Sequence, residues 1–206
     1  MSDFTIVTDS SADLPAGLVQ ELGVEVIPLA FTIQGKTYRN YPDDREMDPK
    51  AFYQMLRSGE VATTSAANAF EFTSAVEPIL QAGRDVLILA FSSGLSTTCQ
   101  SAQLAAQELS EKYPERKVYA VDTLAASHWF TVDDLHFLKR GGRISAATAV
   151  VGSMLSIKPV LHVDDEGHLI NVGKARGRAA SLTALVDKME ETAIDVDTVF
   201  ISHGDC

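Results

Sequence analysis

The sequence contains few cysteines, few basic residues and no long hydrophobic run. Two Cys among 206 residues, one of them the last, indicate a reducing cytoplasm and no structural disulfide. The longest strongly apolar run, Val86–Phe91, is far too short to cross a bilayer, and the first residues lack the pattern of a secretory signal. We therefore expect a cytoplasmic protein with no membrane span, although a transient contact with a membrane surface is compatible with the sequence.

The charge balance and the missing motifs exclude several classes of function. The chain carries 17 Lys and Arg against 28 Asp and Glu, a net charge of -11 that opposes nonspecific binding to nucleic acid. It contains no nucleotide or dinucleotide fingerprint, and its five His lack the paired spacing of a zinc site. We expect no nucleic-acid partner, no metal and no cofactor, while a local site for one small anion remains compatible with this charge.

Continuous apolar strands alternate with helices in the first half of the chain, which predicts an α/β fold with a mainly parallel sheet covered by helices. Residues 24–33 are expected to form one strand and residues 63–68 a polar loop, with Ser11 or Asp13 capping the first helix. The predicted strand ends are rich in hydroxyl groups. Ligands of such sheets bind at the carboxyl ends of the strands, so we expect the site there.

The connection lengths indicate a boundary near residue 127. Only residues 123–127 separate the strand at 118–122 from the extended segment at 128–131, and a parallel crossover needs roughly a dozen residues. We expect an N-terminal α/β domain over 1–127 and a second α/β domain over 128–206. The second domain is expected to contain helices over 132–140, 146–157 and 178–191, a hairpin around 164–167 and a strand over 198–202. Either the segment at 128–131 pairs antiparallel or a segment is missing between Ser127 and His128, and we expect the missing segment. Because the sequence stops at Cys206, directly after an apolar strand, we also expect a further segment beyond it.

The segment from Ala90 to Cys99 leads from a predicted strand into a helix and is rich in Ser and Thr. Free main-chain amides and the positive end of the helix dipole would make such a turn an anion site, with Ser96 and Thr97 adding hydroxyl donors. The simpler interpretation is that these residues cap the helix. A third alternative is a serine-dependent acyl hydrolase using Ser96. Its motif would be incomplete, because Thr98 stands where the nucleophile elbow has Gly, and no His can be assigned as the base.

Two further segments complete the candidate site. Thr63–Ser65 precedes a helix and, with the Ser96 segment, would form a pair of hydroxyl-bearing loops around one carboxylate or phosphate. Lys174–Arg178 is a basic cluster in an acidic chain and either orients an anionic ligand or lies on a solvated surface. His203 follows a predicted strand, and its role is left open.

The order of these motifs resembles the DegV family over essentially the whole chain. The matching residues are Ile6–Pro15, Thr64-Ser65, Ser92–Ala102, Asp122, Phe130–Ser145, Lys158-Pro159, Gly167 and Lys174–Arg178. The resemblance implies that one long-chain fatty acid binds between two domains. It also implies a bacterial lipid-binding protein that is not a catalyst but in some members presents the acyl carboxylate to a separate ATP-using subunit of a fatty acid kinase.

Carried over to this chain, the resemblance implies that the hydroxyls of Thr64 and Ser96 bind the carboxylate, and that Arg176 lies in the segment supplying a basic residue near the ligand head. Ser65 and Thr97, from the hydroxyl-rich segments themselves, are expected to take part in ligand binding. The acyl chain would lie in an apolar tunnel. The family usually has Ser-Gly-Thr-Tyr where this chain has Ser96–Cys99, so a main-chain amide that approaches the ligand through Gly is expected to be less accessible here. Binding of some other small anion is the remaining alternative.

Overall fold

The computed structural model describes residues 4–123, 129–132, 157–164 and 169–192. The chain forms two compact units, which divide after Thr123. The expected boundary between Ser127 and His128 lies outside the described residues and stays a prediction, as does the expected missing segment at this point.

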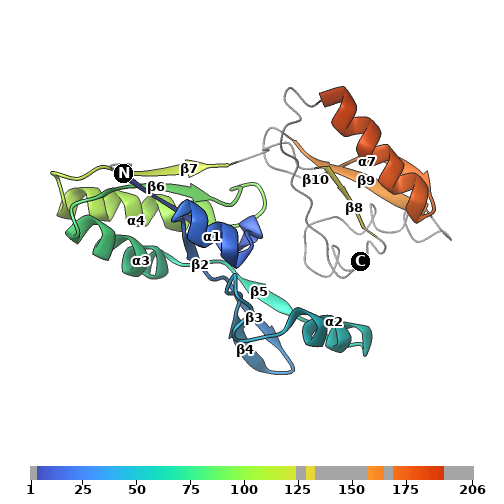
Figure 1. Cartoon of the computed structure of the whole chain (residues 1–206), viewed down its shortest axis with the longest axis horizontal. Helices are drawn as coiled ribbons and strands as arrows, with labels where there is room; N and C mark the ends of the chain where they lie inside the picture. The colour runs from blue at the N-terminus through green and yellow to red at the C-terminus, as the bar shows by residue number, and fades with distance from the viewer. Residues whose placement is uncertain (1–3, 124–128, 133–156, 165–168, 193–206) are drawn as a thin grey trace. The chain divides into compact units, whose positions relative to one another are not determined.

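The first unit is built on a four-stranded parallel sheet in the order β2-β1-β6-β7 (Figure 1). Its strands are Phe4–Asp9 (β1), Glu25–Ile27 (β2), Asp85–Ala90 (β6) and Val118–Asp122 (β7). Every neighbouring pair is parallel, which confirms the predicted α/β fold with a mainly parallel sheet.

Three helices connect these strands: α1 (Ala16–Leu22), α3 (Ala69–Gln81) and α4 (Thr98–Lys112). A capping box in which Asn68 and Glu71 exchange side-chain and main-chain hydrogen bonds fixes the start of α3. Helices α3 and α4 pack together on one face of the sheet. Since parallel crossovers are right-handed, α1, which leads from β1 outward to β2, belongs to the opposite face.

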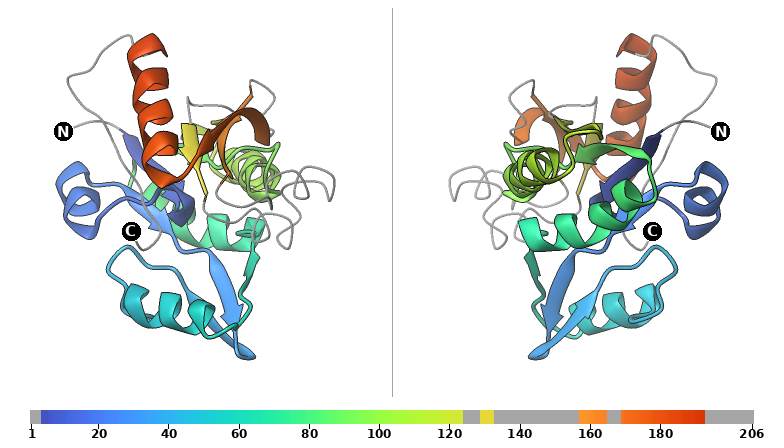
Figure 2. Two further views of the ribbon diagram at one scale, coloured as in Figure 1. Left: turned by 90° about the vertical axis from the view of Figure 1, so that its right-hand side faces the viewer. Right: turned by 90° about the vertical axis from the view of Figure 1, so that its left-hand side faces the viewer.

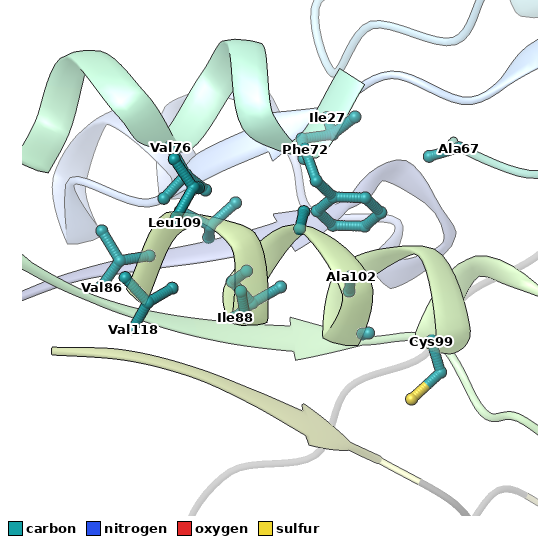
Figure 3. Close-up of a cluster of buried hydrophobic side chains, with 14 of the residues drawn as sticks. Ile27, Ala67, Phe72, Val76, Val86, Ile88, Cys99, Ala102, Leu109 and Val118 are labelled. Carbon is teal, nitrogen blue, oxygen red and sulfur yellow. The ribbon is translucent and has the colours of Figure 1, made fainter. Parts of the chain in front are cut away.

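The hydrophobic core lies between the sheet and the pair α3–α4 (Figure 3). Phe72 and Val76 of α3 meet Leu109 of α4 above Ile88 and Val7 of the sheet, and each is at most 1% exposed. Burial of this kind fixes the strands rigidly, and with them the loops at the carboxyl ends of β1 and β6.

A smaller antiparallel sheet of order β4-β3-β5 projects from one end of the parallel sheet, with helix α2 beside it (Figures 1 and 2). Its elements are β3 (Ala30–Ile33), β4 (Lys36–Arg39), β5 (Thr63–Ser65) and α2 (Pro49–Arg57). The turn at Gln34-Gly35 joins β3 to β4 with φ values of 50° and 73°, which match the two positive φ angles of a type I′ hairpin.

Two expectations about strands are wrong. The run over 24–33 is divided at Pro28 into parallel β2 and antiparallel β3, because proline lacks an N–H for the ladder and fixes its own φ. The expected polar loop at 63–68 begins with strand β5, which pairs with β3. Thr has a high strand propensity, and this pairing outweighs the polarity of the segment.

The expected capping of the first helix is also wrong. Asp13 has φ 50° and ends a short 3-10 turn over Ser10–Ala12, while Pro15 occupies the N-cap of α1 without a side-chain bond. The side chain of Asp9 caps the 3-10 turn instead, through the amide of Ser11.

The second unit contains an antiparallel sheet of order β10-β9-β8 and one helix within its described residues. The strands are Trp129–Thr131 (β8), Ile157–Val163 (β9) and Leu169–Arg176 (β10), and α7 (Arg178–Thr192) contacts all three. The helices expected over 132–140 and 146–157 and the strand expected over 198–202 lie almost entirely outside the described residues. No helix in the described part of the chain is long and apolar enough to span a bilayer.

Candidate ligand-binding site

The parallel sheet has a point where its winding reverses, between β1 and β6. The chain leaves β1 toward β2 on one side and β6 toward β7 on the other. In open α/β sheets, ligands bind in the crevice that such a reversal opens at the carboxyl ends of the strands. Asp9 ends β1 at this point and residues 10 and 11 follow it, while residues 91–97, which we call the Ser96 loop, follow β6.

The main-chain amides of the Ser96 loop are largely occupied by acceptors of the protein itself. The amide of Phe91 donates to Asp9 Oδ2 over 3.0 Å, and the amide of Ser93 donates to Asp122 Oδ1 over 3.1 Å. The next three amides donate to oxygens of Ser92. The expectation of free amides is therefore wrong for these five positions, and the loop offers its hydroxyl groups as further donors for an anion.

The hydroxyl of Ser96 has a structural role and can also donate a hydrogen bond to a ligand. Its Oγ accepts the amide of Thr98 over 3.2 Å and lies 2.8 Å from Thr98 Oγ1. Thr98 is fully buried, whereas Thr97, the N-cap of α4, is exposed and makes no capping bond. A hydroxyl has one donor and two acceptor positions, so when Thr98 donates to Ser96, the proton of Ser96 remains available to a ligand.

Thr64 lies on the aromatic face of the small antiparallel sheet. It stands directly opposite Phe31 across the β3–β5 pair, and Tyr38 stands opposite Phe31 on β4. Facing residues of paired strands project to the same side, so these three side chains share one face. Ser65, one residue on, projects to the other face. The two adjacent hydroxyls proposed for the ligand are therefore separated by the sheet.

Aromatic rings form the floor of this face. The ring of Phe31 stacks on Tyr38 with centroids 5.4 Å apart and meets Phe52 of α2 edge to face at 5.2 Å. Phe52 in turn meets Tyr53 edge to face at 5.3 Å. Aromatic pairs of this kind contribute more to stability than the burial of their surface area alone. The rings therefore form a well-ordered apolar wall.

A pocket of about 310 Å³ opens between the small sheet and α2, and Thr64 lines it. This volume is at the lower end of the range for small-molecule sites, and the mixture of an apolar lining with a few polar groups is typical of them. The hydroxyl of Thr64 is exposed and makes no hydrogen bond to the described residues. The lining residues are Leu29, Ala30, Phe31, Arg39, Asn40, Tyr41, Asp44, Met47, Pro49, Phe52, Tyr53 and Thr64.

The five predicted site residues therefore fall into separate groups. Thr64 lines the pocket, while Ser96 and Thr97 lie at the carboxyl end of β6 and do not line it. Ser65 faces away from Thr64. Arg176 is exposed at the end of β10, in the second unit, where it pairs with Ile157.

A buried thiol lies next to the Ser96 loop. Burial raises the pKa of Cys99 to about 11, and the negative charge and hydrogen bond of Asp122 contribute in the same direction. The side chain stays a neutral thiol at physiological pH and behaves as a small apolar core residue, not as a nucleophile.

The described residues offer Ser96 no partner for nucleophilic catalysis. Both hydrogen-bond partners of its Oγ belong to Thr98, and neither is a base. His162, the one histidine in the described part of the chain, is in the second unit, stacked on Trp129 with ring centroids 4.3 Å apart. Among the residues described, no group of His, Cys, Asp and Glu has the arrangement of a metal site. His203 lies outside them.

Sequence reasoning missed the aromatic pocket and the role of Asp9. The signal for the pocket was the pair Phe52-Tyr53, which follows a helix start at Asp48-Pro49. The signal for Asp9 was weaker: a carboxylate at the end of an apolar run. In the structure it accepts main-chain amides and so has a structural role.

Comparison with known proteins identifies the family. The family model described as "Uncharacterised protein, DegV family" matches residues 3–128 and 125–206. The chain belongs to the DegV family. A DegV domain-containing protein of Clostridium perfringens is 40% identical over 243 residues, an alignment that covers 100% of this chain and 83% of the relative.

Solved DegV structures share the two-domain α/β fold. A DegV family protein from Thermus thermophilus, described by its fatty acid binding, is 35% identical with a TM-score of 0.76, and the match covers 91% of this chain and 77% of that one. The Bacillus subtilis DegV, described as a fatty acid binding protein, is 27% identical with a TM-score of 0.75 over 91% of this chain and 77% of its own. Solved members of the family are thus described as binding proteins for fatty acids, not as enzymes.

Proposed function

We propose that this DegV protein binds one long-chain fatty acid, with its carboxylate held by the hydroxyls of Thr64 and Ser96. The observation that carries the proposal is the exposed hydroxyl of Thr64 on the wall of an aromatic pocket, in a chain 35% identical to a DegV protein described by its fatty acid binding. The acyl chain begins in this pocket and continues along apolar surface beyond it.

The energetics of a fatty acid suit such a site. Each buried methylene contributes about 0.8 kcal/mol, so a long acyl chain supplies most of the affinity. The carboxylate requires a small number of donors, because leaving a buried charge unpaired is costly. Thr64 and Ser96 each have a hydroxyl proton to offer, with Thr97 as an exposed neighbour of the second.

We further propose that the bound acid is presented to an ATP-binding subunit of a fatty acid kinase. Hydroxyl donors stabilise the carboxylate less strongly than a bidentate Arg, so its oxygens keep more of their nucleophilicity toward a phosphoryl group. Arg176, in the second unit, is proposed as the basic residue near the ligand head. No cofactor of its own is needed for this role, since the kinase subunit supplies the ATP.

Native mass spectrometry of the protein after gentle purification tests the binding function. The expected result is a mass increase matching one fatty acid, which is lost after delipidation and restored by adding oleate. Purified protein that neither retains nor rebinds a fatty acid contradicts the proposal. Turnover of an activated acyl ester that disappears in Ser96→Ala would support a serine hydrolase instead.

A further inference from the structure

Two adjacent side chains at the end of β1 connect the two segments that carry the proposed carboxylate donors. Asp9 is 1% exposed and Ser10 is 6% exposed, so both are embedded in the protein. Each uses its side chain to bind main-chain groups of segments far away in the sequence.

Asp9 holds the start of the Ser96 loop. One carboxylate oxygen, Oδ1, accepts the amide and the hydroxyl of Ser11, and the other, Oδ2, accepts the amide of Phe91 over 3.0 Å. Phe91 is the first residue of the loop. This carboxylate therefore fixes the point at which the loop that carries Ser96 and Thr97 leaves the sheet.

Ser10 holds the open end of the hairpin that supports Thr64. Its Oγ accepts the amide of Leu29 over 3.0 Å and the side-chain amide of Asn40 at 3.3 Å. Leu29 directly precedes β3 and Asn40 directly follows β4, and the amide of Asn40 donates to the carbonyl of Leu29 over 2.8 Å. Both residues also line the pocket, and β3 pairs with the strand carrying Thr64.

A second anchor acts at the same end of the hairpin. The guanidinium of Arg39, the last residue of β4, donates to the carbonyl of Pro28 and forms an ion pair with Glu71 in the first turn of α3. The small sheet is thus tied to the parallel sheet and to α3 by polar bonds, all of them near its base.

We propose that Asp9 and Ser10 are positioning residues of the fatty-acid site, which set the separation and direction of Ser96 and Thr64 by holding Phe91, Leu29 and Asn40. This inference rests on the proposed function. The physical reason is that a carboxylate bound by two separate hydroxyls gains both hydrogen bonds only when the donors are held in the correct geometry. Neither Asp9 nor Ser10 needs to touch the ligand.

Double-mutant cycles on delipidated protein distinguish positioning from general stability. In Ser10→Ala we expect the Kd for oleate to rise about fivefold or more, and the effect of Thr64→Val on Kd to shrink by about threefold or more. Asp9→Asn keeps the size of the side chain but replaces one acceptor oxygen by a donor. It is expected to raise Kd similarly and to shrink the effect of Ser96→Ala.

Thr8→Val is the matched control. Thr8 is 8% exposed at the end of the same strand, and its hydroxyl donates to the carbonyl of Leu89 over 2.8 Å, which is within the sheet. Its loss should lower the melting temperature while leaving the Kd and the effects of Thr64→Val and Ser96→Ala unchanged.

The possible results separate the two proposals. If Ser10→Ala binds oleate as the wild type does, or if its effect and that of Thr64→Val on the binding free energy simply add, the positioning role is wrong while the binding function stands. If Asp9→Asn does not fold, the Ser10 cycle decides the question. If wild-type protein binds no fatty acid, both proposals fail together.

Discussion

Thr64→Val is the substitution that isolates the proposed carboxylate contact most cleanly. Valine has nearly the shape of threonine and an equal preference for strands, so β5 should keep its pairing with β3. The hydroxyl it removes is exposed and has no partner among the described residues. The substitution should therefore change the free energy of unfolding by less than about 0.5 kcal/mol.

The expected loss of affinity follows from the kind of hydrogen bond that is removed. A hydrogen bond to a charged group contributes about 1.5–3 kcal/mol, which corresponds to a rise in Kd of about 10- to 150-fold. The aromatic wall formed by Phe31 and Phe52 is unchanged, so binding should weaken without disappearing.

Thr63→Val is the control for this experiment. Thr63 is also exposed, precedes Thr64 on β5 and projects to the opposite face of the small sheet, toward the side of Thr32. Displacement of a fluorescent fatty acid from delipidated protein gives Kd for both variants, and thermal unfolding gives their stability. An equal Kd for wild type, Thr63→Val and Thr64→Val would refute the assignment of Thr64.

Three further predictions concern the neighbourhood of the site and the core. Ser96→Ala should raise Kd and also destabilise the fold by about 1–2 kcal/mol, because the buried Thr98 loses its partner; chemical unfolding measures this, and unchanged stability would contradict it. Cys99, with a pKa of about 11, should resist iodoacetamide at pH 8 in the folded protein and react after unfolding. Peptide mapping separates its labelling from that of Cys206, and rapid labelling of Cys99 itself in the native protein would contradict its burial. The hydrogen bond from Lys112 holds the pKa of Glu77 below its ordinary 4.5, so this pair stabilises the fold above that value and its contribution is lost as the pH falls through the lower, folded pKa. The melting-temperature difference between wild type and Lys112→Met should therefore be present at pH 7 and vanish in acid, and a difference that persists there would be evidence against the pair.

Much of the fold could be predicted because its elements carry their own local signals. The apolar run Val86–Phe91 corresponds to strand β6 (Asp85–Ala90), and the helix expected over 178–191 corresponds to α7 (Arg178–Thr192). Both depend on hydrophobic pattern and end residues, which are local properties of the sequence. The proline at position 28 could be read from the sequence. That it would divide the run 24–33 into two strands could not, because this depends on which strands each half pairs with.

The site was less predictable because its contacts join distant residues. The hydroxyl-rich ends of β1 and β6 could be recognised, but not that Asp9 would occupy the amide of Phe91, 82 positions away. Nor could the polar segment containing Thr64 be expected to pair with Phe31. That pairing is what brings the hydroxyl to an aromatic pocket, and it depends on tertiary structure that overrides local polarity.

The most direct test is a crystal structure of the protein with one bound fatty acid. The predicted result has a carboxylate oxygen within about 2.5–3.0 Å of Thr64 Oγ1 and of Ser96 Oγ, with the first methylenes against Phe31 and Phe52. A carboxylate bound out of reach of both hydroxyls, or an acyl chain that leaves the aromatic pocket empty, would contradict the proposed mode of binding.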